Sequence, residues 1–86
     1  MSRSYRCLLK VPRSGFPEMI ILEPELKLLA GGRSIPHVYP HNNKGTKLCL
    51  WLPSAGEWKS SMRFDETYLP WTAEWLDYFE EWLETD

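Results

Sequence analysis

The N-terminal part of the chain has the two-residue alternation that is typical of a half-buried β-strand. The alternation in residues 4–11 puts four side chains on one face, namely Tyr5, Cys7, Leu9 and Val11. A turn rich in proline, serine and glycine follows at 12–17, and a second apolar run at 18–23 stops before Pro24. Two strands this close in sequence predict an antiparallel pair.

The middle of the chain is less regular. Residues 25–30 fit either a short helical turn or an extended segment, and a pair of glycines ends them. Residues 33–47 have the composition of a loop, and the apolar run at 48–52 predicts a third strand. A connection as long as 33–47 is more typical of a functional loop than of a simple link.

The C-terminal segment, residues 71–84, predicts the clearest element, an amphipathic helix. Its aromatic positions follow the helical spacing i, i+4, i+7, i+8 and i+11, at Trp71, Trp75, Tyr78, Phe79 and Trp82. Thr72, just after Pro70, is the expected N-terminal cap. The fold class is therefore α+β: a small antiparallel meander of about three strands with this helix packed on or beside it. We expect a single compact domain over residues 1–86.

Composition and charge narrow the classes of protein. Hydrophobic residues make up 43% of the 86 residues and charged residues 26%, which fits a globular domain rather than a disordered one. Residues 1–47 hold eight basic and three acidic side chains, whereas 48–86 hold two and nine. The basic residues are scattered, so we expect no nucleic-acid partner.

The chain also lacks the signals of export. No apolar run approaches the roughly 20 residues of a membrane span, and the N-terminus has no apolar signal segment. We therefore expect no membrane partner and a cytoplasmic, reducing location. Nothing in the spacing of Cys7 and Cys49 requires a disulfide, and Cys7 is expected to be a packing residue.

Cys49 is the first candidate for chemistry, because it follows a polar loop that contains His37, His41, Asn42 and Asn43. A nucleophilic thiol needs a nearby base, a positive charge or oriented donors, and these residue types can supply them. The alternative is that Cys49 is a buried packing residue, which is common for free cysteines. The residues alone leave both interpretations open.

The same histidines raise the question of a zinc site, since His37 and His41 have a His-x3-His spacing. Pro40 lies between them and argues against the helix on which such pairs usually sit, and no Cys-x2-Cys pair is present. We therefore expect neither a metal nor another cofactor.

Trp71, Trp75 and Trp82 of the helix have two interpretations. A stripe of large apolar side chains at helical spacing is usually part of a core, and aromatic residues bury much surface in a small domain. The alternative is a face that binds a partner protein.

The order of the motifs resembles the central part of the ubiquitin-conjugating enzyme fold. The sequence HVYP at 37–40 is followed by Leu48-Cys49-Leu50 and by Trp58. The closing stretch, LPW at 69–71 and EWL at 74–76 and 81–83, looks like a bacterial branch of that family. This branch is encoded with cyclic-oligonucleotide anti-phage defence systems (CBASS) and other ubiquitin-like conjugation operons. The resemblance covers residues 5–84.

The resemblance implies a role for specific residues. Cys49 matches the cysteine that accepts the C-terminus of a ubiquitin-like protein, or of another protein, as a thioester and passes it to an amine. His37 matches the histidine of the family's His-Pro-Asn tripeptide, which holds the loop and assists transfer in this branch. Val38-Tyr39 replaces Pro-Asn, so the asparagine that supports the oxyanion has no aligned match; Asn42 and Asn43, with His41, are substitutes by proximity.

The resemblance also implies partners. The family's helix before the first strand has no counterpart here, so we expect the helix at 71–84, a second copy in a homodimer, or a partner chain to cover the open sheet face. Two alternatives remain. One is an inactive module of the same fold that binds a defence nucleotidyltransferase or an effector; the other is an unrelated small α+β protein.

Overall fold

The computed structural model describes residues 3–41, 44–51 and 56–85. The chain forms two compact units, of which the first ends at Leu48 and the second begins at Cys49. A four-stranded antiparallel sheet lies in the first and a C-terminal helix in the second, which confirms the predicted α+β class. Each unit is described separately below.

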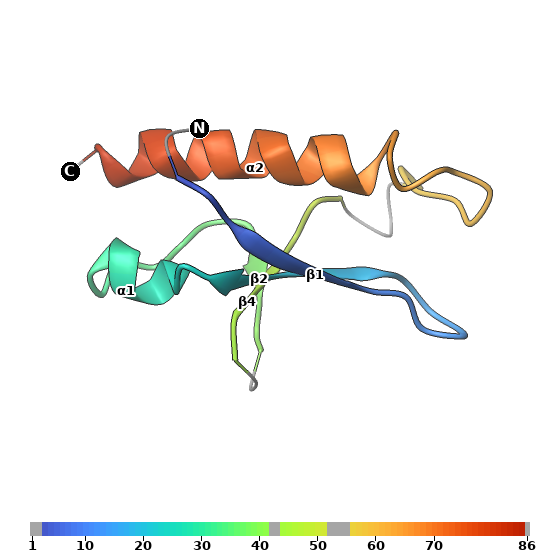
Figure 1. The fold of residues 1–86 in the computed structure, drawn as a ribbon, viewed down its shortest axis with the longest axis horizontal. Coiled ribbons are helices and arrows are strands. Elements are labelled where there is room, and N and C mark those ends of the chain that lie inside the picture. Colours follow the sequence, from blue (N-terminus) through green and yellow to red (C-terminus); the bar gives the residue numbers. More distant parts are fainter. Residues whose placement is uncertain (1–2, 42–43, 52–55, 86) are drawn as a thin grey trace. The chain divides into compact units, whose positions relative to one another are not determined.

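The sheet of the first unit consists of β1 (Arg6–Lys10), β2 (Glu18–Glu23), β3 (Val38–Tyr39) and β4 (Thr46–Leu48). The strand order is β1-β2-β4-β3, and every pairing is antiparallel. Figure 1 shows β1 and β2 running side by side from their connecting turn, as their alternation and the short turn predict. The sheet has four strands rather than about three, because the segment expected to be a loop contributes two.

The core of this unit centres on β2, which lies between β1 and β4. Three successive β2 side chains are buried, so both faces of this strand are covered: Met19, Ile20 and Ile21. A short helix, α1 (Leu26–Ala30), adds the buried side chains at its two ends. Residues 25–30, for which the sequence allows two structures, are thus mostly helical, and α1 ends at Gly31 in the left-handed conformation.

The alternation in β1 does not give the faces that the sequence predicts. Cys7 and Val11 are exposed, although both are predicted to face inward with Tyr5. Leu9, on the same face of β1, is half-buried. The pairing of β1 with β2 also shifts between Arg6 and Cys7. The assignment of Cys7 as a packing residue is therefore wrong, although partial burial of its thiol raises the pKa of Cys7.

The predicted third strand, residues 48–52, is misplaced. The observed strand β4 ends at Leu48, pairs with β2 through Lys47 and Thr46, and pairs with β3 through Leu48 and Lys47. Its burial pattern alternates, with Thr46 and Leu48 buried and Lys47 half-buried. Hydropathy does not reveal this alternation, because the buried Thr46 and the half-buried Lys47 are both polar. The apolar residues that begin at Cys49 lie outside the strand.

The second unit contains α2 (Tyr68–Leu83), which begins three residues before the predicted start. Pro70 lies in its first turn, where a backbone N–H has no partner within the helix, so the proline is tolerated. Thr72 is not the cap: its hydroxyl donates a hydrogen bond to the Tyr68 carbonyl, 2.6 Å away, inside the helix. No helix of the described residues combines the length and hydropathy that a membrane crossing requires.

Aromatic side chains pack together where the chain enters α2. Trp58 lies 6.1 Å from Phe64 in a stacked arrangement and 5.8 Å from Tyr68 in an edge-on one, measured between ring centroids. The indole Nε1 of Trp51 donates a 2.7 Å hydrogen bond to the Tyr68 hydroxyl. Stacked and edge-on pairs of this kind stabilise a small core beyond the area they bury.

Candidate functional site

Cys49 is the first residue after β4, and its side chain is half-buried. Its thiol lies 3.7 Å from the Trp51 carbonyl oxygen, to which it donates a weak hydrogen bond. β4 is held by a neighbouring strand on each side, so the chain that leads into Cys49 has a fixed position at Leu48. The cysteine is therefore outside the strand in which the sequence placed it, and its side chain is not fully enclosed.

His37 lies immediately before β3, with an exposed side chain. Its backbone φ is +56°, the left-handed region, which most side chains avoid and which histidine adopts more readily than bulky or β-branched residues. The next residue, Val38, pairs with Leu48, the residue before Cys49. His37 therefore lies one residue before the pairing of β3 with β4.

Of the three predicted supporting residues, the structure describes only His41. His41 is half-buried, and its Nε2 atom is buried without a hydrogen-bond partner. Asn42 and Asn43 lie outside the described residues, so their role stays a prediction. His37 and His41 belong to the first unit, and Cys49 belongs to the second.

The three helix tryptophans are all half-buried. Trp75 stacks on Phe79 with ring centroids 5.5 Å apart, and Phe79 stacks on Trp82 at 5.9 Å. Trp71 packs against Tyr68 at 5.9 Å. Each ring therefore has both packed and open surface, and the partner-binding role remains a prediction.

The buried face of α2 differs from the predicted stripe. Tyr78 was expected to lie on the apolar face, but it is 67% exposed. The most buried positions of the helix are Tyr68, Thr72, Leu76 and Phe79, which follow the spacing i, i+4, i+8 and i+11. A threonine takes a buried position there because its hydroxyl is satisfied by the helix backbone, a compensation that hydropathy alone does not reveal.

The described ranges contain no cluster of three or more His, Cys, Asp or Glu side chains that could hold a metal ion. Both cysteines are free thiols. The zinc interpretation of His37 and His41 therefore finds no ligand cluster in the part of the chain that the structure describes.

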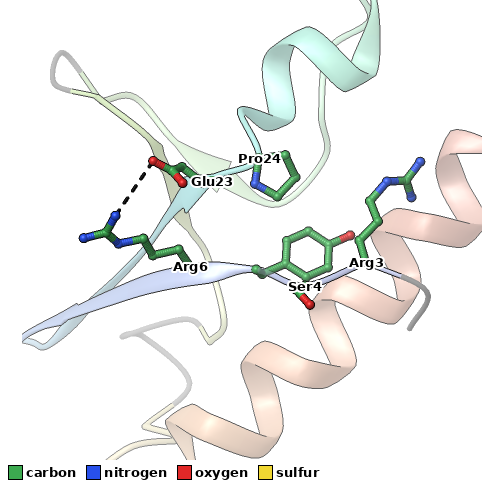
Figure 2. A pocket seen from close by; sticks show the side chains of 6 residues that line it. Arg3, Ser4, Arg6, Glu23 and Pro24 are labelled. Atoms are coloured by element: carbon green, nitrogen blue, oxygen red, sulfur yellow. Dashed lines mark ion pairs between the residues drawn. The ribbon is translucent and has the colours of Figure 1, made fainter.

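An open hollow of about 680 Å³ lies beside the start of β1 and the end of β2. Figure 2 shows Arg6 reaching toward Glu23, with Arg3, Ser4 and Pro24 around the hollow. The Arg6 guanidinium and the Glu23 carboxylate are 3.9 Å apart, and both side chains are mostly exposed. An exposed pair of opposite charges adds little energy and selects no particular ligand.

A smaller cavity of about 310 Å³ brings His41 together with cationic residues that the sequence analysis missed. Three cationic side chains line it, Lys27, Arg33 and Lys47, and so do Thr46 and His41. Residues 1–47 carry most of the basic residues, but nothing in their spacing shows that these three meet. The Lys47 ammonium also pairs with Glu18 at 2.5 Å, which lowers the pKa of that carboxyl.

Comparison with known proteins gives one family. The sequence model of the family described as type II CBASS E2 protein matches residues 1–86. No curated protein matches the chain. The match includes both compact units and Cys49.

Proposed function

The chain belongs to the type II CBASS E2 family, and we propose that it carries an acyl group as a thioester on Cys49. The family gives the chain an E2-like role in CBASS defence. The observation that supports this carrier role is the position of Cys49, a half-buried free thiol directly after a strand held on both sides. A fully enclosed cysteine would have argued for packing alone.

The proposed chemistry has two steps. In the first, the Cys49 thiolate attacks the carbonyl carbon of a protein C-terminus that a separate activating enzyme has converted to an acyl adenylate or a thioester. The sulfur–carbon bond forms, and the activating group leaves with its bonding electrons. In the second, an amine attacks the same carbon, the Cys49 thiolate leaves, and the amine loses a proton. A thiolate leaves readily because its acid has a pKa near 8.5, well below that of an alkyl amine.

The donor in this proposal is the C-terminus of a ubiquitin-like protein or of another protein. Membership of the family involves the chain with other CBASS proteins, and a defence nucleotidyltransferase is our candidate among them. The partly open rings of Trp71, Trp75 and Trp82 are the proposed contact surface, either for such a partner or for a second copy of the chain.

We assign His37 as a positioning residue that supports the turn before β3. Glycine adopts a positive φ without penalty, so His37→Gly preserves this turn while it removes the imidazole. We expect His37→Gly to keep most of the transfer activity, whereas His37→Val should lose about 1–2 kcal/mol of stability and activity with it. Loss of transfer in His37→Gly with an unchanged melting temperature would instead make the imidazole a participant in the reaction.

An inactive binding module of the same fold is the second candidate, and the departure of Val38-Tyr39 from the family's Pro-Asn favours it. A phage challenge of the native host separates the two candidates. The carrier role predicts that Cys49→Ser abolishes protection and that Cys7→Ser, a matched change of an exposed free thiol, preserves it. Full protection by Cys49→Ser would favour the binding module.

A further inference from the structure

The 310 Å³ cavity lies within the first unit and is independent of Cys49. Its wall comes from four parts of the chain: α1 contributes Lys27, the segment before β3 contributes Arg33, β3 contributes Tyr39, and β4 contributes Thr46 and Lys47. A volume of this size is at the lower end of the roughly 300–1,000 Å³ of small-molecule sites. The cavity therefore suits a ligand no larger than a mononucleotide.

Two polar atoms of the cavity residues lack hydrogen-bond partners. Thr46 is 2% exposed, and its hydroxyl oxygen is buried with no partner; the same is true of the Nε2 atom of His41. Buried polar atoms in folded proteins are nearly always hydrogen-bonded, so an unpartnered one calls for an explanation. Here the two atoms belong to residues that line one cavity.

The positive charge of the lining favours a negatively charged ligand. Lys27, Arg33 and Lys47 are cationic, and no carboxylate lines the cavity in the described part of the chain. One of these charges, that of Lys47, is shared with Glu18 and lies 5.3 Å from the centre of the Tyr39 ring. Guanidinium, ammonium and hydroxyl donors around one space match the several acceptor oxygens of a phosphate group.

Apart from Ser34, the rest of the lining is largely apolar. Ile35 and Val38 are half-buried, and the Tyr39 ring adds an aromatic surface. A ligand of phosphate alone would leave this wall unused, whereas a phosphate joined to a flat organic group would contact both parts. We propose that this cavity binds a small organic phosphate of the nucleoside monophosphate class, with the phosphate at Thr46, Lys27 and Arg33 and the base against Tyr39, Ile35 and Val38.

The test is a titration of the whole isotope-labelled protein with AMP, adenosine and inorganic phosphate, followed by amide chemical shifts. AMP is expected to bind with a dissociation constant of about 1 mM or tighter and to shift amides around Arg33, Tyr39 and Thr46. Adenosine and inorganic phosphate should each bind at least about tenfold more weakly, because each uses only part of the lining.

Variants separate a ligand site from a structural feature. Thr46→Val retains the shape of the side chain and removes the unpartnered hydroxyl, so it should weaken AMP binding about tenfold without lowering the melting temperature. Lys27→Gln changes an exposed side chain and should weaken AMP binding by a similar factor, and it serves as the test if Thr46→Val fails to fold. Lys59→Gln, a matched loss of charge in the second unit, should have no effect.

Several outcomes would overturn the inference. No shifts with AMP at about ten times the expected dissociation constant would mean that the cavity holds only water. If adenosine bound as tightly as AMP, the cations would not contribute to binding. If inorganic phosphate bound as tightly as AMP, the apolar residues would not contribute. AMP binding that is unchanged in both Thr46→Val and Lys27→Gln would place the ligand elsewhere.

Discussion

The proposed carrier role predicts that Cys49→Ser removes amine-linked conjugates, with a loss of transfer of roughly a thousandfold or more. Serine has nearly the same shape as cysteine, but its hydroxyl is a much weaker nucleophile at neutral pH. Any ester that formed on its oxygen would also transfer to amines more slowly, because an alkoxide is a poorer leaving group than a thiolate. The measurement is the yield of conjugates on reducing, denaturing gels of host cells that also express other CBASS proteins.

Cys7→Ser is the control for this prediction. Cys7 is also a free cysteine, but it is exposed and lies in β1. Partial burial of its thiol raises the pKa of Cys7, which disfavours the thiolate. Conjugates should therefore form normally in Cys7→Ser. Conjugates that persist in Cys49→Ser and vanish in Cys7→Ser would contradict the assignment of the carrier cysteine.

Gly45→Ala is expected to give the largest loss of stability, about 3 kcal/mol or more. Gly45 directly precedes β4, and its φ of +100° is one that residues with a side chain rarely adopt, at a cost of about 1–3 kcal/mol. An added Cβ would lie 2.8 Å from the backbone oxygen of Ile21 and 2.7 Å from a methyl carbon of Ile20. The backbone oxygen cannot move without disturbing β2, so overpacking adds a further 1–3 kcal/mol or so.

Gly32→Ala provides the matched control for Gly45→Ala. Its φ is +91°, but nothing lies within 4 Å of the position that a Cβ would take. Gly32→Ala should lower the free energy of unfolding only through the backbone strain of a positive φ, by about 1–3 kcal/mol. The free energies of unfolding of both variants, measured in urea, give the steric part by difference. Equal losses would mean that β4 does not pack closely on β2 at Gly45.

The elements with the strongest periodicity could be predicted from the sequence. The hairpin of β1 and β2 and the helix α2 all have long apolar patterns at strand or helix spacing, so their existence follows from hydropathy. Their details depend on local backbone geometry. Cys7 is exposed although it shares a face of β1 with the half-buried Leu9, and the helix begins at Tyr68 because a proline is tolerated in a first turn.

The short strands could not be predicted in the same way. β3 has only two residues and carries no periodic signal, and β4 begins with Thr46 and Lys47, which are polar like the loop before them. Both strands form because the central strand β2 offers β4 an unpaired edge and β4 in turn pairs with β3. This long-range pairing is absent from any local window of sequence.

For the candidate sites, too, the sequence predicted one part and not another. The order of the HVYP and Leu48-Cys49-Leu50 motifs singled out Cys49 as the candidate, and the family match confirms the resemblance on which its proposed role depends. The role of Cys49 itself stays a prediction. The cavity of Lys27, Arg33 and Lys47 was not foreseeable, because its cations are far apart in sequence. The missing hydrogen bond of Thr46 is visible only in three dimensions.

The carrier role of Cys49 is tested most directly by the intact mass of the protein purified from its native host, with Cys49→Ser alongside. We expect the wild-type protein to carry an adduct that thiols and hydroxylamine release, and the mass of that adduct identifies the acyl donor. The thiol-labile adduct should be absent from Cys49→Ser. A wild-type protein without any labile adduct, from cells in which CBASS defence is active, would contradict the thioester and return Cys49 to the role of a packing residue.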